Sequence, residues 1–158
     1  MNTTCNRSAD ELRATVGGSG WHGDSLRDIL RDVTAEQARA RPFPDAHSIW
    51  EIVMHVDAWA QLFLGAHRGI AIPAWATMRP EQDWPRLEAE SQEAWEQCVR
   101  SILKHHAELA EAIAEFGDER LESIVPGRAY TFHRLFQSAS LHAAYHAGQI
   151  ALLKKWSR

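Results

Sequence analysis

The chain has 158 residues, and its 17 basic and 21 acidic side chains leave a formal net charge of -4 with neither a basic block nor an acidic tail. This length corresponds to one domain, residues 1–158, and the dispersed charge makes nucleic acid an unexpected partner, because binding to its backbone requires a dense positive surface. The chain has no apolar run long enough for a membrane span, no signal-peptide pattern and only two cysteines, so we expect a cytoplasmic protein with no membrane partner.

Short helices separated by helix breakers are predicted for the N-terminal part of the chain. The first covers Asn6 to Val16 and ends at the glycine-rich run 17–20, since glycine is costly inside a helix and permits turns. Apolar residues at helical spacing predict a second helix from Leu26 to Val33. A capping-box pattern starts a third, Ala35 to Arg39, which two prolines follow.

Three long helices are predicted for the rest of the chain. The clearest follows Ser48, which has Glu51 three residues later, and runs from Ile49 to His67. We expect the next to be capped by Asp83 and to run to about Phe116, and the last to cover Phe132 to Trp156. No segment shows the alternation that is typical of strands. The fold class is therefore all-α, and three long helices with an interrupted N-terminal helix predict a four-helix bundle.

Two of the nine histidines, His142 and His146, lie four residues apart on the last predicted helix. This spacing places both imidazoles on the face that carries Leu135 and Ala139, so that they point toward the core. A metal ion would satisfy both rings, with His55 on a facing helix as the candidate for a third ligand. The alternative is a pair of core histidines with ordinary hydrogen-bond partners, since spacing alone is a weak signal.

Three segments, in order along most of the chain, carry a resemblance. They are Trp21-His22-Gly23, then Ala46-His47-Ser48-Ile49-Trp50-Glu51 with Val53-Met54-His55, and finally His142-Ala143-Ala144-Tyr145-His146-Ala147-Gly148-Gln149-Ile150. Together they resemble the DinB family of bacterial proteins. The resemblance implies a four-helix bundle, usually a homodimer, that holds one divalent metal ion with His55, His142 and His146. Zinc or nickel suits three imidazoles with open coordination positions best, and iron or manganese are further candidates.

The resemblance also implies a type of chemistry. The wider superfamily includes bacillithiol transferases and mycothiol-dependent maleylpyruvate isomerases, which implies a metal ion that activates a small-molecule thiol. We therefore expect a metal-dependent transferase that uses a low-molecular-weight thiol on a small-molecule substrate, or a metal-dependent hydrolase. The alternatives are a non-catalytic stress-response protein that binds a metal or a small ligand, and a bundle whose histidines hold no metal, because fold alone does not select a function.

Other polar residues are candidates for the surroundings of this site. Glu51 lies one turn before His55 and is the candidate for a catalytic base or a hydrogen-bond partner of that ring, although completion of a capping box is the favoured explanation. Four further residues are candidates for lining a substrate pocket, with solvent contact or core packing as the alternative: His22, His47, Tyr145 and Gln149.

The remaining histidines and cysteines are predicted to be structural. His105 and His106 lie near Lys104 in a charged stretch, which predicts a solvent-exposed face. Cys98 is expected to be a buried structural cysteine, since nothing in its local sequence lowers the pKa of its thiol. Cys5 is expected in a mobile end of the chain.

Overall fold

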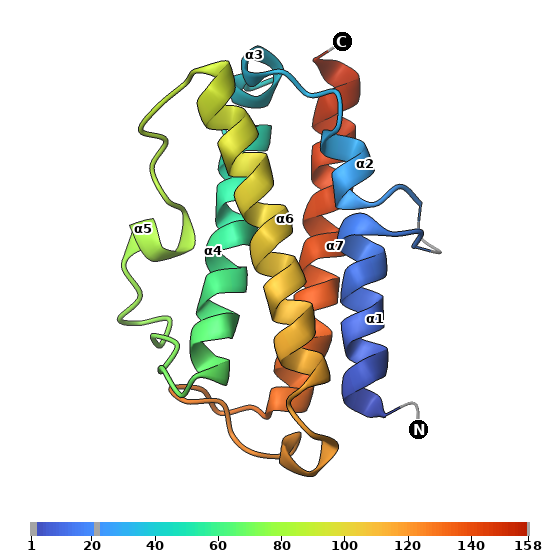
Figure 1. The fold of residues 1–158 in the computed structure, drawn as a ribbon. Helices are drawn as coiled ribbons and strands as arrows, with labels where there is room; N and C mark the ends of the chain where they lie inside the picture. The colour runs from blue at the N-terminus through green and yellow to red at the C-terminus, as the bar shows by residue number, and fades with distance from the viewer. Residues whose placement is uncertain (1–2, 21–22, 158) are drawn as a thin grey trace.

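The computed structural model of the chain describes residues 3–20 and 23–157. Every secondary-structure element within these residues is a helix (Figure 1). The elements in chain order are α1 (Thr4–Gly17), α2 (Leu26–Leu30), α3 (Ala35–Arg39), α4 (Ile49–His67), α5 (Pro80–Asp83), α6 (Gln92–Ala114), the 3-10 helix η1 (Asp118–Arg120) and α7 (Phe132–Trp156). The predicted all-α class is confirmed.

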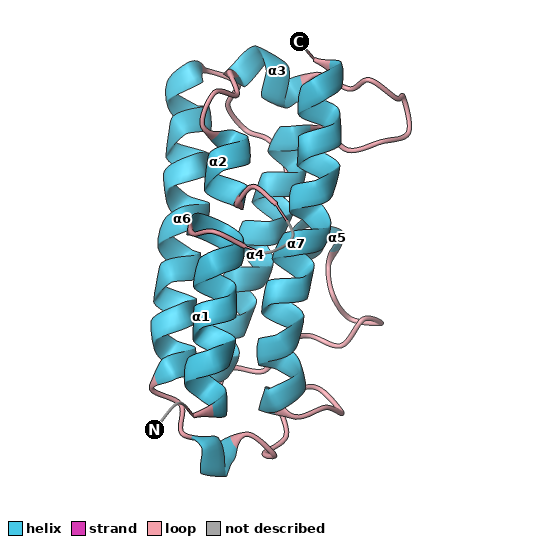
Figure 2. Ribbon diagram, turned by 90° about the vertical axis from the view of Figure 1, so that its right-hand side faces the viewer, coloured by secondary structure: helices cyan, strands magenta, loops and turns pink. Residues whose placement is uncertain are grey.

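Four helices, α1, α4, α6 and α7, form an elongated bundle, which Figure 2 shows from the side. α1 and α7 run in one direction along its axis, and α4 and α6 run in the other. α1 and α4 each pack against both α6 and α7. α2 packs against α7 beyond the end of α1. α1 and α2 together therefore form the interrupted N-terminal helix of the bundle. The predicted four-helix bundle is therefore confirmed. No helix in the described part of the chain is long and apolar enough to cross a membrane.

Aromatic side chains pack against one another between the helices toward both ends of the bundle. Trp50 of α4 meets Trp95 of α6 edge to face, with ring centroids 5.2 Å apart. Toward the other end, Phe116 packs against both Phe132 and Phe136 of α7. Burial of such large rings contributes a major share of the apolar area that stabilises a domain of this size.

α4 and α6 run in the same direction, so the chain must return along the bundle between them. Residues 68–91 make this crossover outside α4, with α5 in its course (Figure 1). The prediction of one long helix capped by Asp83 was wrong. Asp83 is the last residue of α5, residues 84–91 are not helical, and α6 begins after Ser91, whose hydroxyl caps it.

The break after Asp83 has two physical causes. Pro85 disfavours the helical conformation at Trp84, which has φ -123° and ψ 87°. A helix that began at Asp83 would also extend α6 by nine residues, or about 14 Å, past the other members of the bundle. Instead, these residues lie along the side of α4, where they can contact it.

The other helices lie close to their predicted positions. α3, α4 and α7 have the predicted bounds, and the capping boxes at Thr34 and Ser48 are both formed. α1 is slightly longer than predicted, whereas α2 and α6 are shorter and end at Leu30 and Ala114. Gly117 follows α6 with a φ of 89°, a conformation that favours glycine and turns the chain away from the helix axis.

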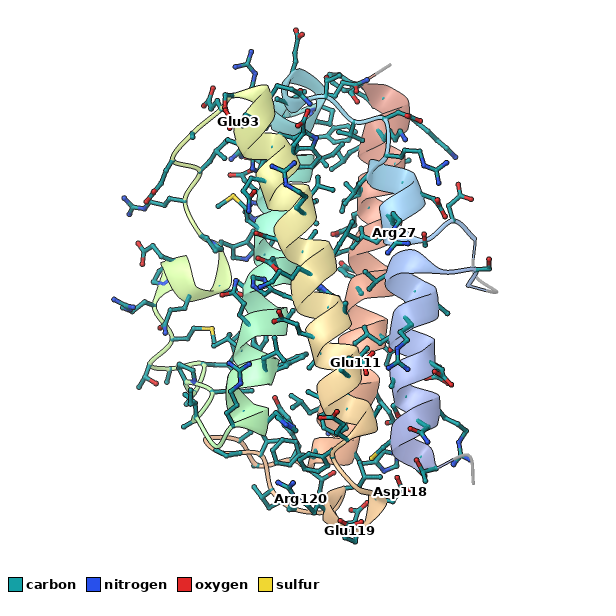
Figure 3. The ribbon with its side chains drawn as sticks, viewed as in Figure 1. Arg27, Glu93, Glu111, Asp118, Glu119 and Arg120 are labelled. Atoms are coloured by element: carbon teal, nitrogen blue, oxygen red, sulfur yellow. The ribbon has the colours of Figure 1, made fainter. Side chains whose placement is uncertain are left out.

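The start of α1 is tied to η1 at the same end of the bundle (Figure 3). The Asp118 carboxylate accepts the backbone N–H groups of Thr4 at 2.8 Å and Cys5 at 2.9 Å. Cys5 is fully buried, so the expectation that it lies in a mobile end was wrong. Burial raises the pKa of the Cys5 thiol to about 11 and that of Cys98 to about 12. Both thiols therefore stay protonated at neutral pH and are poor nucleophiles.

Candidate metal centre

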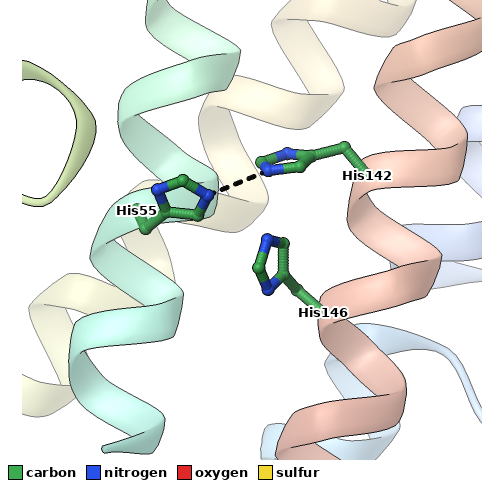
Figure 4. Close-up of side chains that lie close together, drawn as sticks. All are labelled: His55, His142 and His146. Atoms are coloured by element: carbon green, nitrogen blue, oxygen red, sulfur yellow. Dashed lines mark hydrogen bonds between the residues drawn. The ribbon is translucent and has the colours of Figure 1, made fainter. Parts of the chain in front are cut away.

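Three histidines from two helices converge inside the bundle (Figure 4). α4 supplies His55, and α7 supplies His142 and His146, which face α4 together because their spacing keeps them on one side of α7. One ring nitrogen from each histidine lies within 4.8 Å of the other two. Elsewhere in residues 3–20 and 23–157, no comparable group of three His, Cys, Asp or Glu side chains is found. We call these three residues the histidine cluster.

The crossover holds the ring of His55. Its Nδ1–H donates to the backbone carbonyl of Asp83 at 2.7 Å, and Oδ1 of Asp83 lies 3.2 Å from the same nitrogen. That carboxylate also accepts Nε1–H of Trp59 at 2.8 Å. Because a carbonyl oxygen can only accept, Nδ1 carries the ring proton and Nε2 presents a lone pair. Nε2 lies 3.0 Å from Nε2 of His142, so this lone pair is directed into the cluster.

Trp84, the next residue of the crossover, fixes the plane of the same ring. Its indole stacks on His55 with centroids 4.0 Å apart and 12° between the planes. His47 also stacks on Trp84, at 3.5 Å and 8°. Sequence reasoning missed Asp83 as a neighbour of the site. Pro85 could have shown that the helix ends before Trp84, but not that the carbonyl of Asp83 lies beside His55.

His146 is oriented by residues of its own helix. Its Nδ1–H donates to Oε1 of Gln149 at 2.6 Å, and Nε2 of that amide donates to the Tyr145 hydroxyl at 3.3 Å. Nε2 of His146 is therefore left with a lone pair. Hydrogen bonds at the outer nitrogen commonly set the tautomer and the orientation of metal-binding imidazoles.

The three rings are uncharged at neutral pH. Burial lowers the pKa of each ring below its ordinary value of 6.5, and for His142 the neighbouring His146 and His55 add to this effect and lower the pKa to about 3. Neutral imidazole is the form that binds metal ions. The donor set, with lone pairs on His55 and His146 and their outer nitrogens already bonded, therefore fits a divalent ion.

A pocket of about 510 Å³ opens beside His146, a volume within the range of cavities that bind small molecules. Three residues that the sequence analysis proposed for a substrate pocket, His47, Tyr145 and Gln149, line it. The rest of its wall is mainly apolar, with Phe43, Ile52, Trp84, Leu152 and Leu153. The pocket thus joins the surface of the protein to one member of the histidine cluster.

The two other proposed site residues are placed differently. Glu51 completes the capping box of α4, where its carboxylate accepts the backbone N–H of Ser48 at 2.8 Å and pairs with Arg41. It lies outside the histidine cluster, and its catalytic role stays a prediction. His22 lies outside the described residues.

The adjacent histidines of α6 differ from their prediction. His106 is buried, and its Nδ1–H donates to the Ile102 carbonyl at 2.8 Å. His105 is partly buried, with Nδ1 at 2.7 Å from Oδ1 of Asp57 on α4. The prediction of a solvent-exposed face was therefore wrong. Position 106 continues the buried stripe of Ile102 and Leu109, a periodicity that could have shown its burial.

Comparison with known proteins agrees with this arrangement. The family model of the DinB superfamily matches residues 20–150, which include all three cluster histidines. No curated protein and no solved structure gives a significant match. Because the matched region covers most of the sequence, the chain belongs to the DinB superfamily.

Proposed function

We propose that this protein is a metal-dependent enzyme that transfers a low-molecular-weight thiol to a small-molecule substrate, with hydrolysis of a small molecule as the second possibility. The observation that carries the proposal is the convergence of three neutral imidazoles beside an open pocket. We assign His55, His142 and His146 as the metal ligands. Membership in the DinB superfamily supports this assignment.

The metal ion and the residues of the chain have different roles in the proposed chemistry. A divalent ion would lower the pKa of a thiol or water in its coordination sphere by several units, which makes a nucleophile available at neutral pH. The chain holds the imidazoles neutral by burial and fixes the rings of His55 and His146 through Asp83 and Gln149. The pocket beside His146 would bind the substrate.

The surroundings of the cluster favour an enzyme over a protein that only sequesters metal. Sequestration predicts a fourth protein ligand that closes the coordination sphere, and Glu51, one turn before His55 on α4, is an obvious candidate for it. In the structure, Ser48 and Arg41 engage its carboxylate instead. Within the described residues no other acidic side chain or cysteine joins the cluster. A position for water or substrate is therefore part of the proposal.

The metal and the assembly complete the proposal. Three imidazoles suit zinc or nickel, with iron or manganese as further candidates. We also propose a homodimer, which the large exposed apolar side chains Leu141 and Trp156 on α7 support, because such surface often marks an interface. Two unpaired cysteines suit the proposed cytoplasmic setting.

Metal content tests the proposal first. Protein purified without chelator or affinity tag is expected to hold about one ion per chain by elemental analysis, and His142→Ala is expected to lose it. His133→Ala is the matched control, because His133 lies on the same helix but outside the cluster. Wild type that stays free of metal after zinc, nickel and manganese are offered would rule out the metalloenzyme. Bound metal would justify assays of small thiols against electrophiles.

A further inference from the structure

The pocket beside His146 has a mainly apolar mouth. Six of its lining residues are large and mainly apolar: Phe43, Ile52, Trp84, Tyr145, Leu152 and Leu153. Three of these are well exposed, Phe43 at 56% and Tyr145 and Leu152 at 66% each. Exposed apolar surface that gathers at a cavity commonly marks a binding site, because a ligand can remove this surface from water.

The polar groups of the pocket have a defined direction. Nδ1–H of His146 donates to Gln149, and the Gln149 amide N–H donates to the oxygen of Tyr145. The hydroxyl oxygen of Tyr145 is thus already an acceptor, and among the described residues its proton has no acceptor. Tyr145 therefore offers a hydrogen-bond donor at the pocket. The ring centroids of Tyr145 and His146 lie 5.0 Å apart.

The charge of the pocket disfavours anions. Asp45 is an exposed carboxylate in its lining, and the described lining residues include no lysine or arginine. In the metal-free protein, a carboxylate or phosphate ligand would meet the like charge of Asp45 and no lysine or arginine of the pocket.

From these three observations we propose that the pocket binds an uncharged, mainly apolar molecule that carries an acceptor oxygen, with the Tyr145 hydroxyl donating to that oxygen and Asp45 disfavouring anionic analogues. The proposal deepens the proposed function, since it names the class of the small-molecule substrate. It depends only on the pocket side chains, so it can be tested independently of the metal.

Three probes with the same ring system separate the effect of the acceptor oxygen on binding from the effect of negative charge. 2-Acetylnaphthalene is neutral and has an acceptor oxygen, 2-ethylnaphthalene has none, and 2-naphthoate is an anion. Their affinities are measured by calorimetry on wild-type protein whose metal content is determined before and after treatment with a chelator. We expect stripped protein to bind the ketone about tenfold more tightly than the carboxylate and several-fold more tightly than the hydrocarbon.

Paired variants locate the binding. Tyr145→Phe is expected to lower the affinity for the ketone about fivefold and to leave that for the hydrocarbon unchanged. Phe43→Ser is expected to weaken binding of both neutral probes, whereas Ile70→Ser, at a similarly exposed apolar residue outside this pocket, is not. Asp45→Lys is expected to strengthen binding of naphthoate. Glu119→Lys, the charge control at the opposite end of the bundle, is not (Figure 3).

The outcomes are distinguishable from those of the metal test. Equal binding of ketone and carboxylate by stripped protein would overturn the proposal, as would equal effects of Phe43→Ser and Ile70→Ser. Wild type that holds no metal but discriminates between the probes as expected would remove the proposed metalloenzyme and keep the pocket assignment. Wild type that binds metal but does not discriminate between the probes would keep the proposed metalloenzyme and remove the pocket assignment.

Discussion

Two groups of histidines in this bundle differ in how their ring nitrogens are used. In α6, His105 is paired with Asp57, and His106 donates to a carbonyl of its own helix. Each of these two rings therefore has its own hydrogen-bonding partner in the protein. In the histidine cluster, by contrast, His55 and His146 each use Nδ1 for a protein partner and direct Nε2 toward the other cluster rings.

Burial does not account for this difference. His106 is 4% exposed, while His55 and His146 are each 6% exposed. Burial also lowers the pKa of all three rings. What distinguishes the cluster is that its remaining nitrogens converge from two helices. The comparison indicates that the direction of the second ring nitrogen separates a candidate ligand from a structural histidine.

The largest expected effect comes from removal of a cluster ring. His146→Ala is expected to lower the affinity for zinc by more than about a hundredfold, because it removes a ligand rather than an outer hydrogen-bond partner, whose loss costs tenfold to a hundredfold. His105→Ala should leave the affinity within a factor of about two. Competition with a chromogenic chelator measures both. Similar losses in the two variants would show that the comparison is wrong.

The reverse pattern is expected for the stability of the metal-free protein. His106→Ala should lower the free energy of unfolding by about 2 to 3 kcal/mol, since it leaves a cavity in the core, and should not change the zinc content. Denaturation by urea in the presence of a chelator measures the first effect. His133→Ala, at a more exposed position on α7, should cost less than about 0.5 kcal/mol. Loss of zinc from His106→Ala would contradict its structural role.

Local signals account for the parts of the molecule that sequence reasoning predicted. The capping box at Ser48 and the long apolar stripe of α4 are properties of neighbouring residues, and so is the four-residue spacing of His142 and His146. Such signals depend on helix geometry alone. They were sufficient for the bounds of α4 and α7 and for the shared face of His142 and His146. The grouping of these two residues with His55 rested on the resemblance to the DinB family.

The crossover could not be predicted in the same way. Residues 84–91 include Leu87 and Glu88, which favour helix, but the chain there must return along the bundle, a requirement set by the arrangement of α4 and α6. The partner of His55 is a backbone carbonyl, that of Asp83, and a backbone group leaves no trace in residue identity. The surroundings of the site therefore depend on tertiary structure to a greater degree than the cluster itself.

The pH dependence of stability gives a smaller effect that sharpens the comparison. The unfolded chain takes up a proton on His142 near pH 6.5, whereas the pKa of this ring in the folded protein is about 3. Between these values the unfolded state binds more protons, so the free energy of unfolding falls as the pH is lowered. From pH 7 to pH 5, His142 should account for a loss of about 2 kcal/mol. Denaturation of metal-free protein at both pH values measures this loss, and His142→Ala should reduce it by that amount. An unchanged profile in the variant would mean that His142 is not held neutral by its surroundings.

The smallest expected effect concerns the outer partner of a cluster ring. Gln149→Leu should lower the affinity for zinc about tenfold, because Nδ1–H of His146 loses its acceptor and the ring loses its fixed orientation. Gln149→Glu keeps an acceptor oxygen and should keep or raise the affinity. Gln137→Leu is the matched control, since Gln137 contacts His133 on the same helix but outside the cluster. If Gln149→Leu and Gln137→Leu bound zinc equally well, the hydrogen bond at Nδ1 would have no part in preparing His146 as a ligand, and convergence of the inner nitrogens alone would distinguish the cluster from the α6 pair.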